Sequence, residues 1–243
     1  MVDIHSHILP EVDDGARSWE MAVHMCHMAA KDGIEHMVAT PHANHEYAYD
    51  RVEFASLLDE LGGQIEPKLS LSLGCDFHFS YENLESLIDH PENYTIGSTP
   101  YLLVELSDFA VPPGVSSKLQ EIMDWGLRPI LTHPERNPLL QRTPERVLRW
   151  VQHGCIVQVT ASAFTGRWGK RAQDMAEWLL RHDAVHVLAS DAHSINSRPP
   201  ILSEGRDAAA QICGAQIANI LVQQNPAAIV RGEPLPYFPA PRK

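Results

Sequence analysis

The segment Asp3-Ile4-His5-Ser6-His7, close to the N-terminus, is the first stretch of this chain whose residue types could do chemistry. Side chains two positions apart on an extended strand point to the same face, so the imidazoles of His5 and His7 can reach one point in space. Two imidazoles at one point are typical of a metal site. Because a single His-x-His pair also occurs by chance on surface strands, the prediction of a metal site depends on further ligands elsewhere in the chain.

Short apolar runs rich in β-branched residues alternate with longer amphipathic segments along the chain. The runs predict seven strands, at residues 2–4, 35–39, 69–75, 101–106, 128–131, 155–159 and 186–189. This alternation is typical of an α/β protein with a parallel sheet wrapped by helices, and seven β/α units come close to the eight of a standard barrel. No internal repeat or low-complexity linker interrupts the pattern, so a single domain is predicted over residues 1–243. Its proline-rich residues 232–243 are expected to be laid over the surface or left mobile.

Capping residues mark the ends of the predicted helices. Ser18 can cap a helix that runs to Lys31 before Gly33, and Asp50 can cap residues 51–61, which stop at Gly62-Gly63. Further helices are predicted at residues 116–125, 145–153, 170–182 and 202–224.

Histidines and carboxylates follow most of the predicted strands at the point where each strand ends. In a parallel barrel these ends converge on one mouth, so the side chains should lie close together. The candidate metal ligands are His5, His7, Asp14, His42, Asp76, Glu105, His133, Asp191 and His193. Only the sixth predicted strand, residues 155–159, has no evident ligand after it.

Mixed imidazole and carboxylate ligands without thiolate suit Mn²⁺, Fe²⁺ or Zn²⁺, and nine of them are too many for one ion. Two metals about 3.5–4 Å apart can activate a water and hold the oxygens of a phosphoryl group. Arg136 and Arg198, each close in sequence to a candidate ligand, would add planar donors that match phosphate oxygens. The sequence therefore predicts phosphoester hydrolysis.

Composition excludes several other classes of function. The formal net charge of −12 argues against a nucleic-acid-binding protein or a protein that binds anionic membranes, because either would need a basic face. The four cysteines lie far apart, and none begins the Cys-x5-Arg loop of thiol-based tyrosine phosphatases. No leader precedes His5, and no apolar run approaches about 18 residues, so a cytoplasmic protein without membrane insertion is expected.

Together these motifs resemble the polymerase-and-histidinol-phosphatase (PHP) superfamily. The resemblance is carried in order by Asp3-Ile4-His5-Ser6-His7, Val12-Asp13-Asp14-Gly15, Pro41-His42, Glu105, His133-Pro134-Glu135-Arg136, Ala189-Ser190-Asp191-Ala192-His193 and Arg198-Pro199-Pro200. Within the superfamily, the chain is most similar to the bacterial tyrosine phosphatases encoded with capsule and exopolysaccharide genes. That resemblance implies a distorted (β/α)7 TIM-like barrel and a three-metal site usually occupied by manganese, with Fe, Mg or Zn as other occupants. It also implies that the substrate is the phosphotyrosine-bearing tail of a cytoplasmic kinase.

The resemblance also implies a role for each site residue. His5, His7 and Asp191 would hold one metal, Glu105 and His133 a second with the carboxylate of residue 76 between the two, and Asp14, His42 and His193 the third. A metal-activated hydroxide would attack phosphorus in line, while Arg136 and Arg198 bind the phosphate. One position departs from the family pattern, because Asp76 stands where Glu is usual and has one methylene less of reach.

Several alternatives remain open at the level of sequence. The substrate could instead be histidinol phosphate or another small phosphomonoester, or the chain could be a non-catalytic regulator that binds the kinase. Asp13 is expected to shape only the turn before Gly15, and His78 either assists Asp76 or is simply packed or solvated. The basic cluster Arg167–Arg171 is either a docking surface with Trp168 as its anchor or a solvated helix start.

Overall fold

Parallel strands form two sheets in the computed structural model, which describes residues 1–65 and 69–242. The smaller sheet has the order β1-β2-β4 and the larger sheet has the order β3-β5-β6-β7-β8-β9. The bounds of the strands are β1 Val2–Ser6, β2 His36–Ala39, β3 His42–Ala43, β4 Ser70–Leu73, β5 Asp76–His78, β6 Tyr101–Glu105, β7 Arg128–Thr132, β8 Ile156–Thr160 and β9 Val187–Ala189. The predicted parallel α/β architecture is confirmed.

Close connections link the two sheets. Two residues separate β2 from β3, and two separate β4 from β5. The chain therefore passes almost directly from a strand of the smaller sheet into a strand of the larger sheet at both places. An isolated parallel bridge pairs Ser6, at the end of β1, with Ala192, just after β9. The short strands β3 and β5 were not predicted, because two or three residues carry too little periodicity to be recognised.

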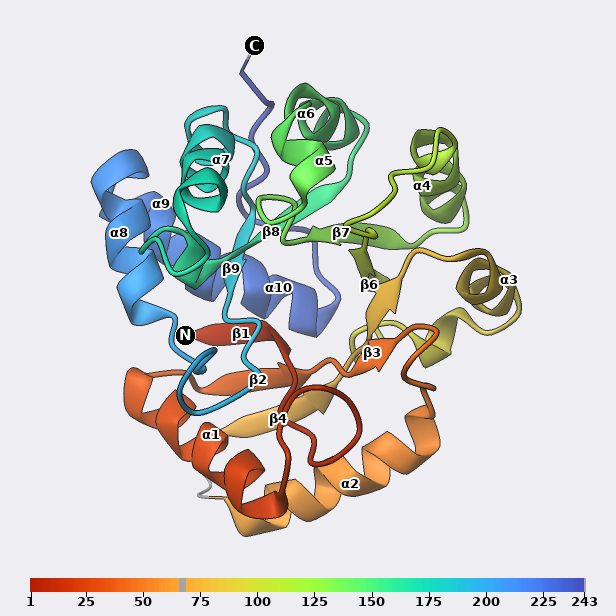
Figure 1. Ribbon diagram of the computed structural model, residues 1–243, viewed down its shortest axis with the longest axis vertical. Helices are drawn as coiled ribbons and strands as arrows, with labels where there is room; N and C mark the ends of the chain where they lie inside the picture. Colours follow the sequence, from red (N-terminus) through yellow and green to blue (C-terminus); the bar gives the residue numbers. More distant parts are fainter. Residues whose placement is uncertain (66–68, 243) are drawn as a thin grey trace.

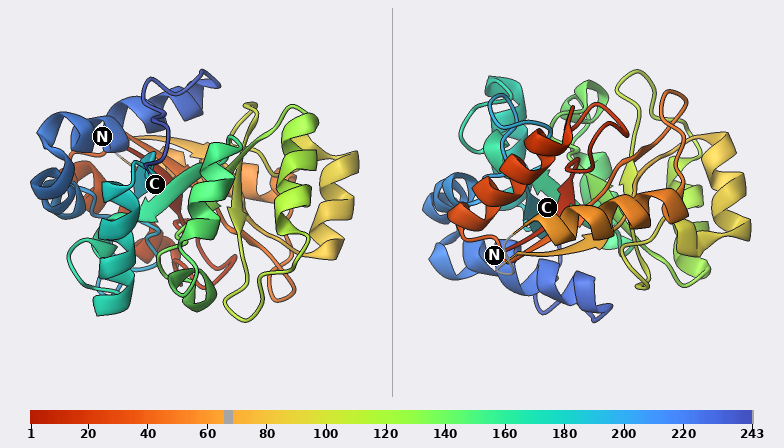
Figure 2. Two further views of the ribbon diagram at one scale, coloured as in Figure 1. Left: turned by 90° about the horizontal axis from the view of Figure 1, so that it is seen from above. Right: turned by 90° about the horizontal axis from the view of Figure 1, so that it is seen from below.

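Helices surround the strands on the outside, as Figures 1 and 2 show. Their bounds are α1 Trp19–Asp32, α2 Arg51–Gln64, α3 Tyr81–Asp89, α4 Val115–Asp124, α5 Pro138–Gln141, α6 Glu145–Gln152, α7 Lys170–Arg181, α8 Ser203–Cys213, α9 Ala215–Asn219 and α10 Asn225–Arg231. No helix among the described residues is both long enough and apolar enough to cross a membrane.

The predicted caps of the first two helices are confirmed. The Ser18 hydroxyl accepts a hydrogen bond from the backbone N–H of Met21, and Asp50 accepts from Val52 and Glu53 at the start of α2. Gly33 ends α1 in the left-handed conformation, with φ 89°.

Two predicted helix boundaries are wrong. Helix α2 continues through Gly62 and Gly63 to Gln64, because the packing of its buried residues Phe54, Leu58 and Leu61 outweighs the modest helix penalty of glycine. The single helix predicted at residues 202–224 is broken at Gly214, whose φ of 83° is incompatible with a continuing helix. The chain then continues through α9 and a π-helical turn at Ile220–Gln224 into α10. Helices α3 and α5 were not predicted.

The C-terminal segment is held against the amino ends of the strands. The side-chain amide of Asn225 donates to the carbonyls of His186 and Tyr237, and its oxygen accepts from the Tyr237 backbone N–H. The described part of the predicted tail, residues 232–242, is therefore laid over the surface, and Lys243 lies outside the described residues.

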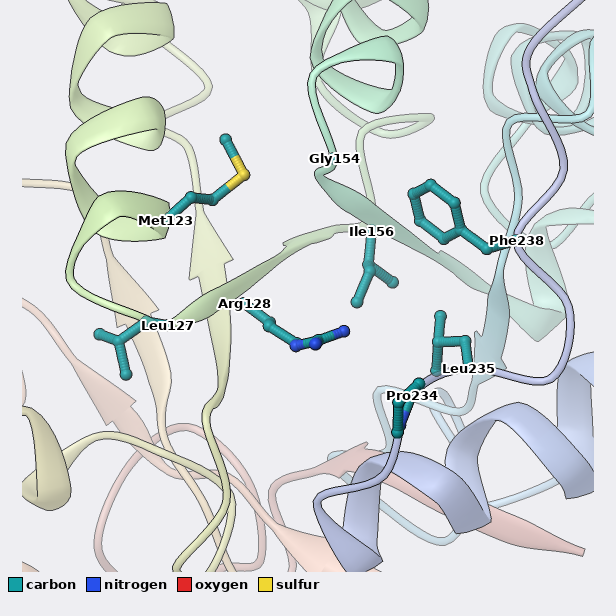
Figure 3. A pocket seen from close by; sticks show the side chains of 8 residues that line it. All are labelled: Met123, Leu127, Arg128, Gly154, Ile156, Pro234, Leu235 and Phe238. Atoms are coloured by element: carbon teal, nitrogen blue, oxygen red, sulfur yellow. The ribbon is translucent and has the colours of Figure 1, made fainter.

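This segment also lines a cavity of about 440 Å³, shown in Figure 3, into which Arg128 points. Its walls come from the starts of β7 and β8 and from Pro234, Leu235 and Phe238. The cavity therefore lies at the amino ends of these strands, away from the predicted ligands at their carboxyl ends.

A buried histidine makes stability depend on pH. His186 is fully buried before β9, its Nδ1 accepts a hydrogen bond from the Val157 N–H, and its ring stacks on Phe238 with the centroids 4.4 Å apart. Burial lowers the pKa of His186 from 6.5 to about 3. The unfolded chain therefore binds a proton that the folded chain excludes between these values, and stability falls as the pH drops below 6.5.

We expect the variant His186→Asn, whose amide oxygen can accept the same hydrogen bond, to weaken this pH dependence. The wild-type protein should lose up to about 1.4 kcal/mol of unfolding free energy per pH unit below pH 6.5 through His186 alone, and the variant should lack that part of the slope. Urea unfolding at pH 7.0, 6.0 and 5.0 measures it, with the exposed His153→Asn as the control. Equal slopes in all three proteins would contradict the assignment.

Candidate metal centre

The nine predicted ligands form one connected cluster at the carboxyl ends of the strands. Three overlapping groups bring ligand atoms within 4.8 Å of one another. They are His7, Asp14, His42 and His193; His5, His7 and Asp76; and His42, Asp76 and Glu105. The two remaining predicted ligands adjoin these groups, since His133 Nε2 lies 3.6 Å from Glu105 Oε1 and Asp191 Oδ1 lies 3.5 Å from His5 Nε2.

Asp76 lies at the centre of the cluster. Its Oδ2 is 3.5 Å from His5 Nε2 and 3.2 Å from His42 Nδ1, and His42 Nδ1 is 3.8 Å from Glu105 Oε2. The pairing of β3 with β5 places His42 directly opposite Asp76. The pairing of β5 with β6 places Glu105 opposite His78, two residues beyond Asp76. The ladder of parallel strands thus sets the spacing of these three residues.

An irregularity in β1 turns both Ile4 and His5 toward β8. Between Asp3 and Ser6 the register of β1 against β2 shifts, so β1 contains one extra residue there. As a result, the consecutive residues Ile4 and His5 both face β8. Ile4 packs in one cluster with Ile156, and His5 bonds to Gln158. Strict alternation would have pointed the side chains of Ile4 and His5 to opposite faces of the sheet.

Two of the predicted ligands have left-handed backbone conformations. His133 has φ 33° and Asp191 has φ 51°, values that residues other than glycine rarely adopt. Such strain persists only where the surrounding structure fixes it, and it is concentrated at functional sites.

Three supporting residues orient the candidate ligands. Gln158 Oε1 lies 2.9 Å from His5 Nδ1, and Asp13 Oδ2 lies 2.7 Å from His7 Nδ1, so each histidine turns Nε2 toward the cluster. Asp3 Oδ1 accepts hydrogen bonds from the N–H groups of His5 and Ser190 and fixes the ends of β1 and β9. The sequence predicted the contact of Asp13 with the Gly15 turn, which is confirmed at 2.9 Å, but not its bond to His7.

The sequence signal for these supporting residues was weak. Gln158 is a buried residue of the sixth predicted strand, the one with no ligand after it, and a glutamine within an otherwise apolar run was its signal in the sequence.

Arg136 and Arg198 also meet at the cluster. Both guanidinium groups donate to Asp191 Oδ2, the Arg198 Nη2 at 2.6 Å, while Asp191 Oδ1 faces His5 and His7. The indole of Trp168 packs against both arginines, with its centroid 4.1 Å from the Arg136 Cζ and 5.1 Å from the Arg198 Cζ. Trp168 is thus a partly buried neighbour of the arginines rather than a free surface anchor.

His78 and Arg167 have direct contacts that differ from the simplest predictions. His78 Nδ1 lies 3.3 Å from Glu105 Oε2, so it is neither merely packed nor merely solvated. Arg167 donates to the carbonyl of Ser197 at 3.1 Å and supports the loop that carries Arg198.

The pKa values at the cluster follow the balance of burial and charge. Burial disfavours the protonated form of His5, but the carboxylates of Asp76 and Asp191 outweigh it and raise its pKa to about 9. Burial, with the nearby charge of His193, lowers the pKa of His7 to about 3. Burial opposes ionisation of Asp191 as well, but Arg136 and Arg198 hold its pKa well below the usual range.

The donor set fits divalent cations. Asp76 is fully buried, yet neither of its carboxylate oxygens makes a hydrogen bond to any described residue, and the same is true of the buried His42 Nδ1 and His193 Nε2. An unpaired buried carboxylate is costly unless a cation lies beside it. Imidazole nitrogens and carboxylate oxygens without thiolate are the ligands expected for Mn²⁺, Fe²⁺ or Zn²⁺.

A parallel α/β fold with clustered imidazoles and carboxylates at its strand ends defines a protein of the metal-binding α/β class. The model of the family "Capsular polysaccharide synthesis, CpsB/CapC" matches residues 1–231, and the chain belongs to this family. The family predicted from the motifs is therefore confirmed.

Curated relatives carry consistent names. The chain is 32% identical over 208 residues to the putative tyrosine-protein phosphatase CapC of Staphylococcus aureus. This match covers 84% of this chain and 81% of the relative. It is 29% identical over 239 residues to the tyrosine-protein phosphatase CpsB of Streptococcus pneumoniae, covering 95% and 98%.

Solved structures show the same relationship. A structure from the study of YwqE from Bacillus subtilis and CpsB from Streptococcus pneumoniae, described as unique metal-dependent tyrosine phosphatases, matches with a TM-score of 0.93 and 26% identity. The match covers 100% of this chain and 98% of the other. A D-hydantoinase matches with a TM-score of 0.54 and 11% identity over 93% of this chain and 69% of the other, which shows likeness of fold alone.

Asp13 provides a test of the supporting contacts. We expect Asp13→Asn to weaken divalent-ion binding by about 10–100-fold, because the neutral amide holds the Nδ1 proton of His7 less firmly. A calorimetric titration of the metal-free protein with Mn²⁺ measures this affinity.

The matched control is Asp59→Asn on the exposed face of α2, which should bind Mn²⁺ like the wild-type protein. Unchanged affinity in Asp13→Asn would show that His7 does not need this partner.

Proposed function

We propose that this protein is a metal-dependent protein-tyrosine phosphatase, acting on phosphotyrosine of a bacterial kinase that regulates capsule or exopolysaccharide synthesis. The observation that carries the proposal is the single cluster that joins nine metal-ligand side chains to two arginines through Asp191. The names of the relatives support the choice of substrate. Under this proposal the protein acts in the cytoplasm, on the kinase tail.

The proposed ligand sets follow the family pattern. His5, His7 and Asp191 would hold one ion, Glu105 and His133 a second with Asp76 between the two, and Asp14, His42 and His193 the third. The close approach of His193 Nε2 and His42 Nε2 to Asp14 Oδ1, at 3.3 and 3.4 Å, supports the third set. Manganese is the proposed occupant, with Fe, Mg or Zn as alternatives.

The chemistry divides between the ions and the side chains. Divalent ions at such a site supply Lewis-acid chemistry, which lowers the pKa of water and neutralises phosphoryl oxygens. Arg136 and Arg198 bind and orient the phosphate through their planar N–H donors. Asp13 keeps a proton on His7 Nδ1 and leaves Nε2 free as a ligand. Tyrosinate, with a pKa of about 10, leaves with less help from a general acid than an alkoxide would need.

We also infer that the two sheets belong to one distorted (β/α)7 barrel in a single domain. The bridge between Ser6 and Ala192 and the short breaks between β2 and β3 and between β4 and β5 support this arrangement. So does an apolar cluster that receives inward residues from several strands and is capped by α10. Its strand members are Ile4, Val38, Tyr101, Leu103, Ile130, Ile156, Val187 and Ala189, and its α10 member is Ile229.

Two rival functions are distinguished by experiment. A PHP-type phosphatase of a small phosphomonoester would prefer histidinol phosphate to a phosphotyrosine peptide. A non-catalytic regulator of the kinase would hydrolyse neither, and the complete ligand cluster argues against it.

We expect the Mn²⁺-loaded protein to hydrolyse a phosphotyrosine peptide with a kcat/KM well above that for histidinol phosphate, and a chelator to abolish both activities. The variant His42→Ala should lose more than about 100-fold in kcat/KM, because even supporting contacts of metal sites are typically worth about 10–100-fold. Phosphate release measures the rates, and metal analysis gives the ion content of each protein.

The control is His24→Ala, an exposed residue of α1, which should keep full activity. Preference for histidinol phosphate, or an active chelated protein, would overturn the proposal.

A further inference from the structure

The two phosphate-binding arginines share one aromatic neighbour. Trp168 lies in the loop between β8 and α7, more than thirty residues along the chain from Arg136 and thirty from Arg198. The Arg136 Cζ lies 4.1 Å and the Arg198 Cζ 5.1 Å from the centre of its ring. The fold therefore brings three distant segments together so that a single indole contacts both guanidinium groups.

Several contacts fix Trp168 itself. Its Nε1–H donates to Ser162 Oγ at 3.0 Å, and the Arg167 N–H donates to the Ser162 carbonyl at 3.2 Å. Gly166 and Gly169, with φ 80° and 82°, bracket it in a tight turn closed by the hydrogen bond from the Gly169 N–H to the Gly166 carbonyl at 3.0 Å. The ring is thus held in place independently of the arginines.

The loop of Trp168 also holds the loop of Arg198. Arg167 donates to the Ser197 carbonyl at 3.1 Å, directly before Arg198. Within the loop of Arg198, its backbone N–H donates to Ser194 Oγ at 3.1 Å and its carbonyl accepts from the His193 N–H at 2.9 Å. Residues 167–168 therefore contact both the backbone directly before Arg198 and its side chain.

The guanidinium groups need such a platform because, among the described residues, their hydrogen bonds all go to Asp191. Each guanidinium donates to Asp191 Oδ2, and the buried Nε of Arg198 has no hydrogen-bond partner in the described part of the chain. An aromatic face attracts a guanidinium cation while its N–H edge stays free for an anion. Such a contact typically changes an equilibrium by a factor of about 2–30.

We propose that Trp168 is a positioning residue that holds Arg136 and Arg198 as a preformed two-guanidinium clamp for a phosphate dianion. The identity of the ester that carries this phosphate rests on the proposed function, but the clamp itself needs only the phosphate group. Removing the ring lets both arginine side chains adopt other rotamers. The affinity for phosphate should therefore fall more than the rate at which bound substrate is hydrolysed.

Three variants separate the aromatic face from simple space filling. Trp168→Phe keeps a face, Trp168→Leu keeps apolar volume without one, and Trp168→Ala removes both. Calorimetry with inorganic phosphate on the Mn²⁺-loaded protein measures the clamp directly, and KM and kcat with a phosphotyrosine peptide measure it in turnover. Melting temperature and metal content report whether each variant is folded and loaded.

We expect Trp168→Leu and Trp168→Ala to weaken phosphate binding about tenfold or more and to raise KM in parallel, with kcat changed by less than about threefold. Trp168→Phe should stay within about threefold of the wild-type protein. The exposed Trp125→Ala should match the wild-type protein throughout.

Phosphate binding by Trp168→Leu at the wild-type level would overturn the proposal, as would a loss confined to kcat. If Trp168→Ala does not fold, the comparison of the Leu and Phe variants decides. Wild-type protein that binds phosphate but hydrolyses no phosphotyrosine peptide would contradict the proposed function and leave the calorimetric test of the clamp intact.

Discussion

The constraint on which the centre depends is the burial of several carboxylates at one place. Asp76 and Asp191 are almost completely inaccessible to solvent, and isolated charges in such surroundings are strongly destabilising. Asp191 is compensated by two arginines, which hold its pKa low. Among the described residues Asp76 has no hydrogen bond, imidazoles and the Glu105 carboxylate lie beside it, and one of the imidazoles, His5, has its pKa raised to about 9 in response to Asp76 and Asp191. The protein therefore attracts positive charge to this point, and divalent ions are the cations that its remaining donors suit.

The parallel sheets and a few local distortions deliver these groups. Strand pairing sets His42 opposite Asp76 and sets Glu105 opposite His78, two residues beyond Asp76 on β5. The extra residue in β1 adds His5, and the left-handed backbone of Asp191 adds its carboxylate. Regular secondary structure alone would not bring so many candidate ligands to one place. The backbone strain is therefore concentrated where these residues lie.

The gathering of the candidate ligands could be predicted from the sequence because parallel strands end on one side, a rule that needs only the position of each strand. The supporting groups could not. Gln158 in β8 reaches His5 in β1 although these two strands are not paired within the described sheets, and the contact of Trp168 with Arg136 joins the loops that follow β8 and β7, so neither leaves a local pattern. The bulge in β1 is equally invisible, because register is a property of two strands. Helix caps are local and were predicted well at Ser18, whereas the break at Gly214 depends on a backbone conformation that many glycines inside helices do not adopt.

The departure at Asp76 can now be judged from distances. Two ligand atoms that share an ion at about 2.1 Å each, at angles of 90–109°, lie about 3.0–3.4 Å apart. Asp76 Oδ2 lies 3.5 Å from the Nε2 of His5, a ligand of the first proposed ion, so its carboxylate already reaches that neighbour at nearly this separation. It also lies 3.2 Å from the Nδ1 of His42, whose Nε2 faces Asp14 in the third proposed set. The β3–β5 pairing places residue 76 opposite His42, which brings the backbone close enough that a longer side chain is not required. The shorter acid therefore fits a site for shared cations, and this argues against reading Asp76 as the sign of a decayed, non-catalytic centre.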